Sequence, residues 1–261
     1  SFFLDPHEVL LDPLREAGRL SNLRHFEVGS VVDQRVGVGE LLHDAIQAMP
    51  RLESVKLCVD QFSESGLFGG NYPHLHTIHL TYNNPRCRFY MLGYNAGLPN
   101  LRRLHLDTVS VMPQQGELGS DREPITPSDL QSFFRSQHLK ALEYFTFRNG
   151  EFADAGVEEL LASGFVNRLK GLDLCQCRIT DDGAQLLAAH PAIPHLEYLH
   201  LDGNLLSPIG IDALEAVGVS VSRDQFFDQG DDEFVDEQDD GNELDPDGER
   251  DTDEIDFGED E

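Results

Sequence analysis

The chain has little positive charge. Of its 261 residues, 19 are Lys or Arg and 48 are Asp or Glu, which gives a formal net charge of −29. Duplex nucleic acid and anionic membrane surfaces attract proteins mainly through Lys and Arg. We therefore expect no direct nucleic-acid partner and no membrane partner, whereas a basic protein partner fits this charge.

Cysteine, tryptophan and long hydrophobic runs are also scarce. The chain has four cysteines and no tryptophan, and no hydrophobic stretch is long enough to span a bilayer. A chain of this length needs no disulfide to fold, so the sparse cysteines predict reduced thiols and a cytoplasmic location. The nucleophile-elbow, zinc-protease and P-loop motifs are missing. We expect no enzyme activity, no cofactor and no metal.

What the sequence does contain is a repeat with a step of 27 residues. The step relates three leucines, three glycines and three further leucines, which are Leu142, Leu169 and Leu196; Gly156, Gly183 and Gly210; and Leu160, Leu187 and Leu214. Looser copies precede them, so that we count about seven repeats plus a weak closing copy at Val217, Val219 and Val221. Self-similarity at a fixed period indicates a solenoid.

Each repeat contains the signals of one strand and one helix. A short L-x-L core alternates with period two, as in a strand with one buried face. Asn204 or Cys177 follows at the turn, where a small polar side chain can bond to the backbone. A helix with one apolar face comes next, and Thr180 is the expected N-cap of one of them. Stacked copies would form an α/β solenoid, or horseshoe, with a parallel sheet on the concave side and helices on the convex side.

The pattern divides the chain into three parts. Residues 1–19 are expected to hold a capping helix, residues 20–222 the repeats, and residues 223–261 a disordered acidic tail. Residues 224–261 contain 20 Asp or Glu and one Arg. A step lengthened by 14 residues maps to 109–127 and predicts a protruding loop. Either the loop is functional or it is a tolerated surface insertion.

The segments Leu169–Leu187 and Leu196–Leu214 resemble leucine-rich repeats of the ribonuclease-inhibitor type. The resemblance covers about residues 20–221 and implies a horseshoe that binds proteins, usually without catalysis. The arrangement is also similar to bacterial leucine-rich-repeat proteins of unassigned function. Two other families combine leucine-rich repeats with an acidic tail: the GTPase-activating protein of the Ran system, and acidic nuclear phosphoproteins that bind basic proteins. They imply a regulator of an enzyme or GTPase, or a tail that binds basic proteins.

The strand pattern also predicts which side chains face the concave side. The residues that flank the inward apolar positions mix aromatic, Arg and His side chains, which are frequent interface anchors. The candidate binding residues are Lys56, His79, Arg103, His105, Asp107, Tyr144, Arg148, Asp173, Tyr198, His200 and Asp202. Since adjacent strands lie about 4.8 Å apart, His79 and His105 should be neighbours.

Weaker readings remain for some of these residues. His79, His105 and Asp107 could hold a metal but lack a spaced ligand set on one element. Cys175 and Cys177 do not have the C-x-x-C spacing of a redox or metal pair, so we expect Cys177 to be a buried structural thiol and Cys175 to face the concave side. The tail either binds a basic partner or only keeps the chain soluble.

Overall fold

The structure is a computed structural model that describes residues 3–4, 19–29, 45–59, 67–82, 89–108, 127–150, 152–221 and 225. Its strands form one parallel sheet, in which they are arranged in their order along the chain. They are β1 (Phe3–Leu4), β2 (His25–Val28), β3 (Ser54–Val59), β4 (Thr77–Tyr82), β5 (Arg103–Thr108), β6 (Tyr144–Arg148), β7 (Gly171–Asp173) and β8 (Tyr198–His200). Each strand therefore pairs with the strand of the next repeat.

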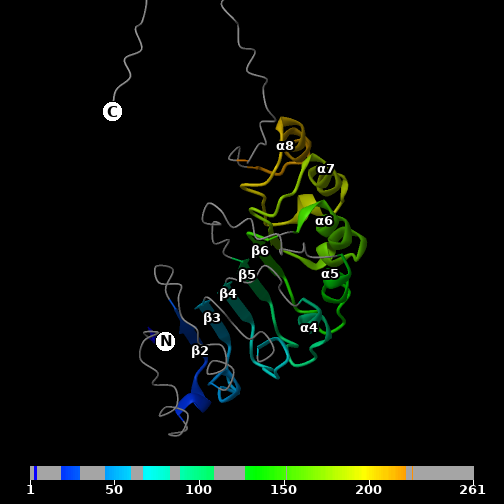
Figure 1. Cartoon of the computed structure of the whole chain (residues 1–261). Helices are drawn as coiled ribbons and strands as arrows, with labels where there is room; N and C mark the ends of the chain where they lie inside the picture. Colours follow the sequence, from blue (N-terminus) through cyan, green and yellow to red (C-terminus); the bar gives the residue numbers. More distant parts are fainter. Residues whose placement is uncertain are drawn as a thin grey trace, which may run out of the picture. The chain divides into compact units, whose positions relative to one another are not determined.

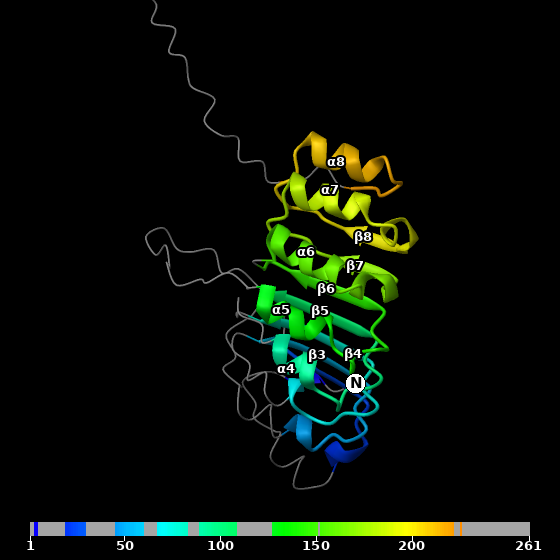
Figure 2. The same cartoon turned by 90° about the vertical axis from the view of Figure 1, so that its right-hand side faces the viewer.

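The helices of the repeats lie on one side of this sheet. They are α4 (Phe89–Tyr94), α5 (Pro127–Phe134), α6 (Ala153–Ala162), α7 (Asp181–Ala189) and α8 (Pro208–Glu215), with 3-10 turns η1 (Arg19–Asn22), η2 (Phe165–Arg168) and η3 (Ile193–His195). Figure 1 shows the helices on the outer side of a curved stack and the strands on its inner side, and Figure 2 shows the helices lying one above another. The predicted leucine-rich-repeat solenoid is confirmed.

A buried side chain fixes the turns after β7 and β8, at the position that the repeat predicts. The Asn204 side-chain amide donates to the carbonyls of Leu174 and Leu201, and its oxygen accepts from the amides of Cys177 and Ile179, at 2.8–3.0 Å. Cys177 takes the same position one repeat earlier, is fully buried, and donates its thiol to the Phe147 carbonyl. These bonds satisfy backbone groups that the turn would otherwise leave unpaired.

Phenylalanines fill the core where the longer repeat joins its neighbours. Seven buried rings, from α4 to η2, pack with centroid distances of 5.0–6.4 Å in tilted or edge-on arrangements. They are Phe89, Phe133, Phe134, Phe145, Phe147, Phe152 and Phe165. Phe145 and Phe147 occupy inward positions of β6 that leucines occupy in the next repeats, and the wider side chains fill the space that α4 and α5 leave.

The two ends of the stack differ from what the sequence suggested. The structure adds the strand β1, paired with β2, where no strand was predicted. The capping helix expected within residues 1–19 would fall on residues 5–18, which lie outside the described residues. The closing copy is not a further strand, although Val219 and Val221 are buried at the end of the core. The loop 109–127, apart from Pro127, which begins α5, and all of the tail except Gln225 also lie outside the described residues.

Candidate binding surface

The middle positions of seven strands form one row across the concave face. The pairing places Glu27, Lys56, His79, His105, Thr146, Asp173 and His200 side by side, each opposite the next. This is the row that the sequence predicts, because a constant repeat keeps equivalent residues in register. Two further rows flank it: Arg103, Tyr144, Gly171 and Tyr198 on one side, and Asp107, Arg148, Cys175 and Asp202 on the other.

The two central histidines stack on each other. The rings of His79 and His105 have centroids 3.8 Å apart and planes within 17°. Burial lowers the pKa of both, and the charge of Lys56 adds to this for His79. The pKa of His105 falls to about 4 because of burial, its neighbour His79 and the positive charge of Arg148. The pair therefore presents neutral, flat rings near neutral pH.

Asp173 is buried, although the strand pattern predicts an exposed position on the concave side of the sheet. The Arg148 Nε donates to its two carboxylate oxygens at 3.1 and 2.9 Å, Arg148 Nη2 donates to Oδ2, and His200 Nδ1 lies 3.5 Å from the same oxygen. Burial by itself would raise the pKa of Asp173, but the hydrogen bonds from Arg148 and Cys175 hold it below its ordinary value. Asp173 is thus an ionised anchor that positions Arg148, with 3% of its own surface exposed.

Four side chains of β5, β6 and β8 form a stacked series that we call the aromatic row: Arg103, Tyr144, Tyr198 and His200. The Arg103 guanidinium lies 3.8 Å from the centre of the Tyr144 ring, the Tyr144 and Tyr198 rings are 6.2 Å apart with planes within 19°, and Tyr198 is 4.8 Å from His200. Cation–π and aromatic contacts of this kind hold side chains in one arrangement.

Two residues that the sequence analysis did not select fix the aromatic row. A Cβ at Gly171 would lie 2.3 Å from Tyr198 Cζ, so only glycine leaves β7 open for that ring. The Tyr144 hydroxyl donates to Glu197 at 2.9 Å across the intervening strand. Gly171 falls between Tyr144 and Tyr198 in the repeat register, and this gap in the row was the signal that could have identified it.

The other flanking row borders a hollow of about 420 Å³ at the ends of the strands. It is lined by Asp107, Arg148, Asn149, Cys175, Gln176, Asp202 and Gly203. Asn149, Gln176 and Gly203 are 27 residues apart and all have positive φ, so the same left-handed turn recurs in three repeats. The Asn149 amide donates to Asp107 at 2.6 Å, and burial raises the pKa of Cys175 to about 12, which makes the thiol unreactive near neutral pH.

The predicted residues therefore separate into two groups. The first group lies on β4 to β8, with Asp202 in the turn after β8. Its members form the histidine stack, the aromatic row, the buried Arg148–Asp173 pair and the lining of the hollow. Lys56 lies on β3, exposed and 2.7 Å from Glu27, in an ion pair of the kind that contributes little to stability. Over the ranges that the structure describes, no three His, Cys, Asp or Glu side chains are placed to hold a metal.

Comparisons with known proteins bear on the fold. No protein-family model matches the sequence, and no curated protein matches it. A solved protein of Bacteroides fragilis is similar with a TM-score of 0.62 and 19% identity; the match covers 86% of this chain and 64% of that one, so the chain spans less than two thirds of its length. The mouse RP105/MD-1 complex matches at a TM-score of 0.41 and 17% identity, over 80% of this chain and 31% of that one. None of the helices in the described segments is long and apolar enough to cross a membrane.

Proposed function

We propose that this chain is a protein-interaction module that binds a protein partner on its concave face, at β4 to β8. The observation that carries the proposal is the aromatic row. Arg and Tyr side chains are enriched among interface anchors, and here they are held in one arrangement on a half-exposed sheet before any partner binds. A preorganised surface loses less conformational entropy on binding.

Part of the proposal is that the chain has no catalytic activity and no cofactor. Two concave groups that could serve as a base or a nucleophile are already engaged or inert. Asp173 is held by Arg148, and Cys175 stays protonated near neutral pH because burial raises its pKa. The buried thiols Cys175 and Cys177 also fit the proposed cytoplasmic location.

Affinity capture with concave variants tests the proposal. Tyr144→Ala and Arg148→Ala should lose the partner that the unchanged chain retains, because each removes an anchor of the surface. Gln185→Ala, on the exposed side of α7, is the matched control and should retain it. If both concave variants capture the same protein with unchanged affinity, the concave face is not the binding surface.

Two alternatives concern other parts of the chain. A regulator of an enzyme or GTPase would act through the rim of the sheet, where the same left-handed turn recurs at Asn149, Gln176 and Gly203. Changing the rim residue Arg178 to Ala would then lower the catalytic rate of the partner. An acidic tail that binds basic proteins would lose its partner when residues 224–261 are removed and when salt is raised. A relationship to ribonuclease-inhibitor-type or bacterial leucine-rich-repeat proteins is likewise a proposal, supported by the 27-residue step.

A further inference from the structure

The last strand of the sheet has an open edge. β8 pairs with β7 and ends the strand order of the described sheet. The Leu174 amide donates to the His200 carbonyl at 2.9 Å, so the N–H and C=O of His200, and those of Tyr198 two residues earlier, face β7. Since successive residues of a strand point their N–H and C=O groups to opposite sides, those of Leu199 face the open edge. Proteins usually cover or blunt such edges, because they can pair with another chain.

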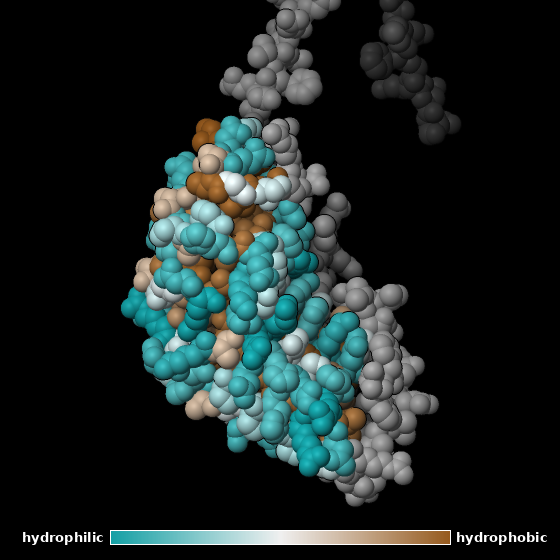
Figure 3. All heavy atoms as spheres, turned by 180° about the vertical axis from the view of Figure 1, so that it is seen from behind, coloured by the Kyte–Doolittle hydropathy of each residue, from teal (hydrophilic) through white to brown (hydrophobic). Residues whose placement is uncertain are grey.

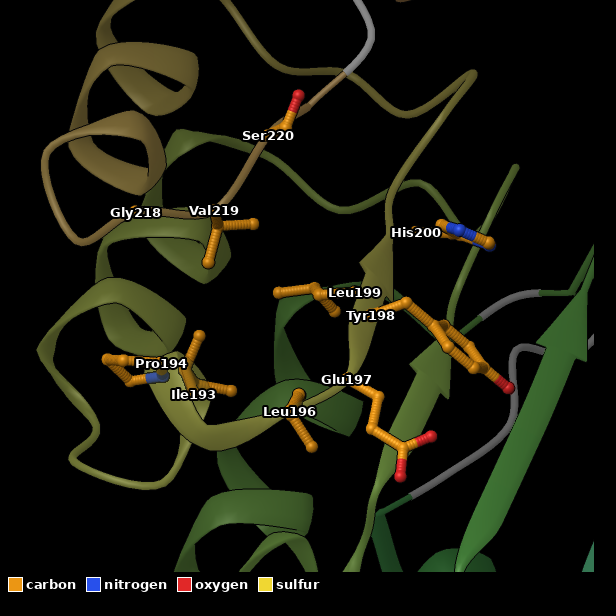
Figure 4. A pocket seen from close by; sticks show the side chains of 10 residues that line it. All are labelled: Ile193, Pro194, Leu196, Glu197, Tyr198, Leu199, His200, Gly218, Val219 and Ser220. Carbon is orange, nitrogen blue, oxygen red and sulfur yellow. The ribbon is translucent and has the colours of Figure 1, made fainter.

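A hollow of about 440 Å³, which we call the end hollow, lies beside this edge (Figure 4). Its walls come from η3, β8 and the segment after α8. Half of the residues that line it are apolar, and the full lining is Ile193, Pro194, Leu196, Glu197, Tyr198, Leu199, His200, Gly218, Val219 and Ser220. On the face shown in Figure 3, apolar residues also gather toward the end of the stack that carries α8.

The end hollow is the place where a further repeat would lie. Inside the stack, each inward leucine is covered by the next repeat, as Leu172 is by Leu199. Leu142 and Leu169 are buried, whereas Leu196, the third leucine at this position, is only partly buried. The closing copy leaves the space beside β8 open, because its segment covers the core with Val219 and Val221 without pairing as a strand.

Charge distinguishes between the possible occupants of this space. The Asn204 backbone N–H donates to Gln225 Oε1 at 2.9 Å, so Gln225 lies beside the repeat of β8. Gln225 belongs to the acidic sequence, since residues 224–261 carry 20 Asp or Glu and one Arg. A second copy of the chain would bring the same negative charge to the edge. A segment with Lys or Arg beside its apolar residues would be attracted instead.

We propose that the open edge of β8 is a docking surface, separate from the concave face, for an extended segment of a protein partner. The segment adds a strand to β8 through the N–H and C=O of Leu199, places an apolar side chain in the end hollow, and carries basic residues on its flanks. Strand addition of this kind takes its affinity from main-chain hydrogen bonds and its specificity from the pocket for alternate side chains.

A designed peptide tests the proposal with the full chain. The probe is a fluorescent peptide of alternating Thr and Val with a pair of Lys at each end, followed by anisotropy. One comparison peptide has Glu pairs at the ends, and another has Pro at the central position, which cannot donate to a strand edge. We expect the Lys-flanked peptide to bind, and each comparison peptide to bind about tenfold or more weakly.

Protein variants locate the binding. Ser220→Trp should fill the end hollow from an exposed position and weaken the peptide about tenfold, whereas Gln185→Trp, equally exposed on α7, should have no effect. The capture experiment with Tyr144→Ala and Arg148→Ala tests the concave surface separately, so that failure here is distinguishable from failure of that surface. Equal binding of the Lys-flanked and Pro peptides would overturn strand addition, and unchanged binding by Ser220→Trp would overturn the site. A dimer of the unliganded chain that Ser220→Trp dissociates would show that the occupant is a second copy.

Discussion

At the scale of single residues, His105 should make the stability of the fold depend on pH. Its pKa is lowered from 6.5 to about 4, so the unfolded chain binds more protons than the folded chain between these values. The contribution of neutral His105 to the free energy of unfolding is complete above about pH 6.5 and decreases as the pH falls toward 4. His105→Gln should reduce the loss of unfolding free energy between about pH 7 and about pH 5, measured by urea denaturation. The exposed His195→Gln is the control, and an undiminished loss in His105→Gln would contradict the assignment.

Gly171 should control the arrangement of Tyr198 more than the stability of the fold. In Gly171→Ala the added methyl would displace the flexible Tyr198 ring and break its contact with Tyr144, at a cost of about 0.5–1.5 kcal/mol. The check is a double-mutant cycle with Tyr198→Ala, read by urea denaturation and by ring contacts in NMR spectra. If Gly171→Ala is as costly in the Tyr198→Ala background as alone, the methyl acts on the backbone instead.

At the scale of elements, the starts of α7 and α8 are each tied to the preceding repeat by one carboxylate. Asp181 accepts from the Ser207 amide at 2.8 Å, from the Gly210 amide at 3.1 Å and from the Ser207 hydroxyl. Asp154 has the same role one repeat earlier, where it bonds to Thr180. A Cβ would lie 2.4 Å from Asp181 Oδ1 at Gly210 and 2.3 Å from Asp154 Oδ1 at Gly183, which explains these two glycines of the 27-residue series. At Gly156 the close neighbour is instead the Phe152 ring.

Asp181→Ala should therefore loosen α8, an element in which Asp181 does not lie. Losing charge-assisted hydrogen bonds to a helix start costs about 1.5–3 kcal/mol. Hydrogen exchange should accelerate in α8 and less so in α7. Asp182→Ala, at the exposed neighbouring position in the same first turn of α7, is the matched control. Equal effects of the two variants would assign the loss to the dipole of α7 and not to the bonds across repeats.

The same elements show what could be predicted from the sequence. The period gave the strands, the Thr180 cap, the Cys177 position and the neighbouring histidines, because each follows from stacking identical units. The burial of Asp173 could not be predicted, since it depends on the Arg148 side chain of the preceding strand β6, which covers and binds the carboxylate. Gly171 and Glu197 were missed for a related reason. The role of Gly171 depends on the orientation of the Tyr198 ring, one strand away, and that of Glu197 on the orientation of Tyr144, two strands away.

At the scale of the whole molecule, the most extensive contacts join neighbouring repeats, so stability should be coupled along the stack and weakest where a repeat is altered. The phenylalanine cluster joins α4 and α5 to β6 and η2, at the repeat with the longer connection. Phe145→Ala should cost about 3–5 kcal/mol and uncouple the two halves, so that urea unfolding separates into two transitions with smaller m-values. Leu214→Ala, equally buried but at the end of the stack, should lower the protection of α8 and β8 while β3 and β4 stay protected in hydrogen exchange. A single transition with an unchanged m-value for Phe145→Ala would mean that the repeats unfold as one unit, and that the altered repeat is no weaker than the others.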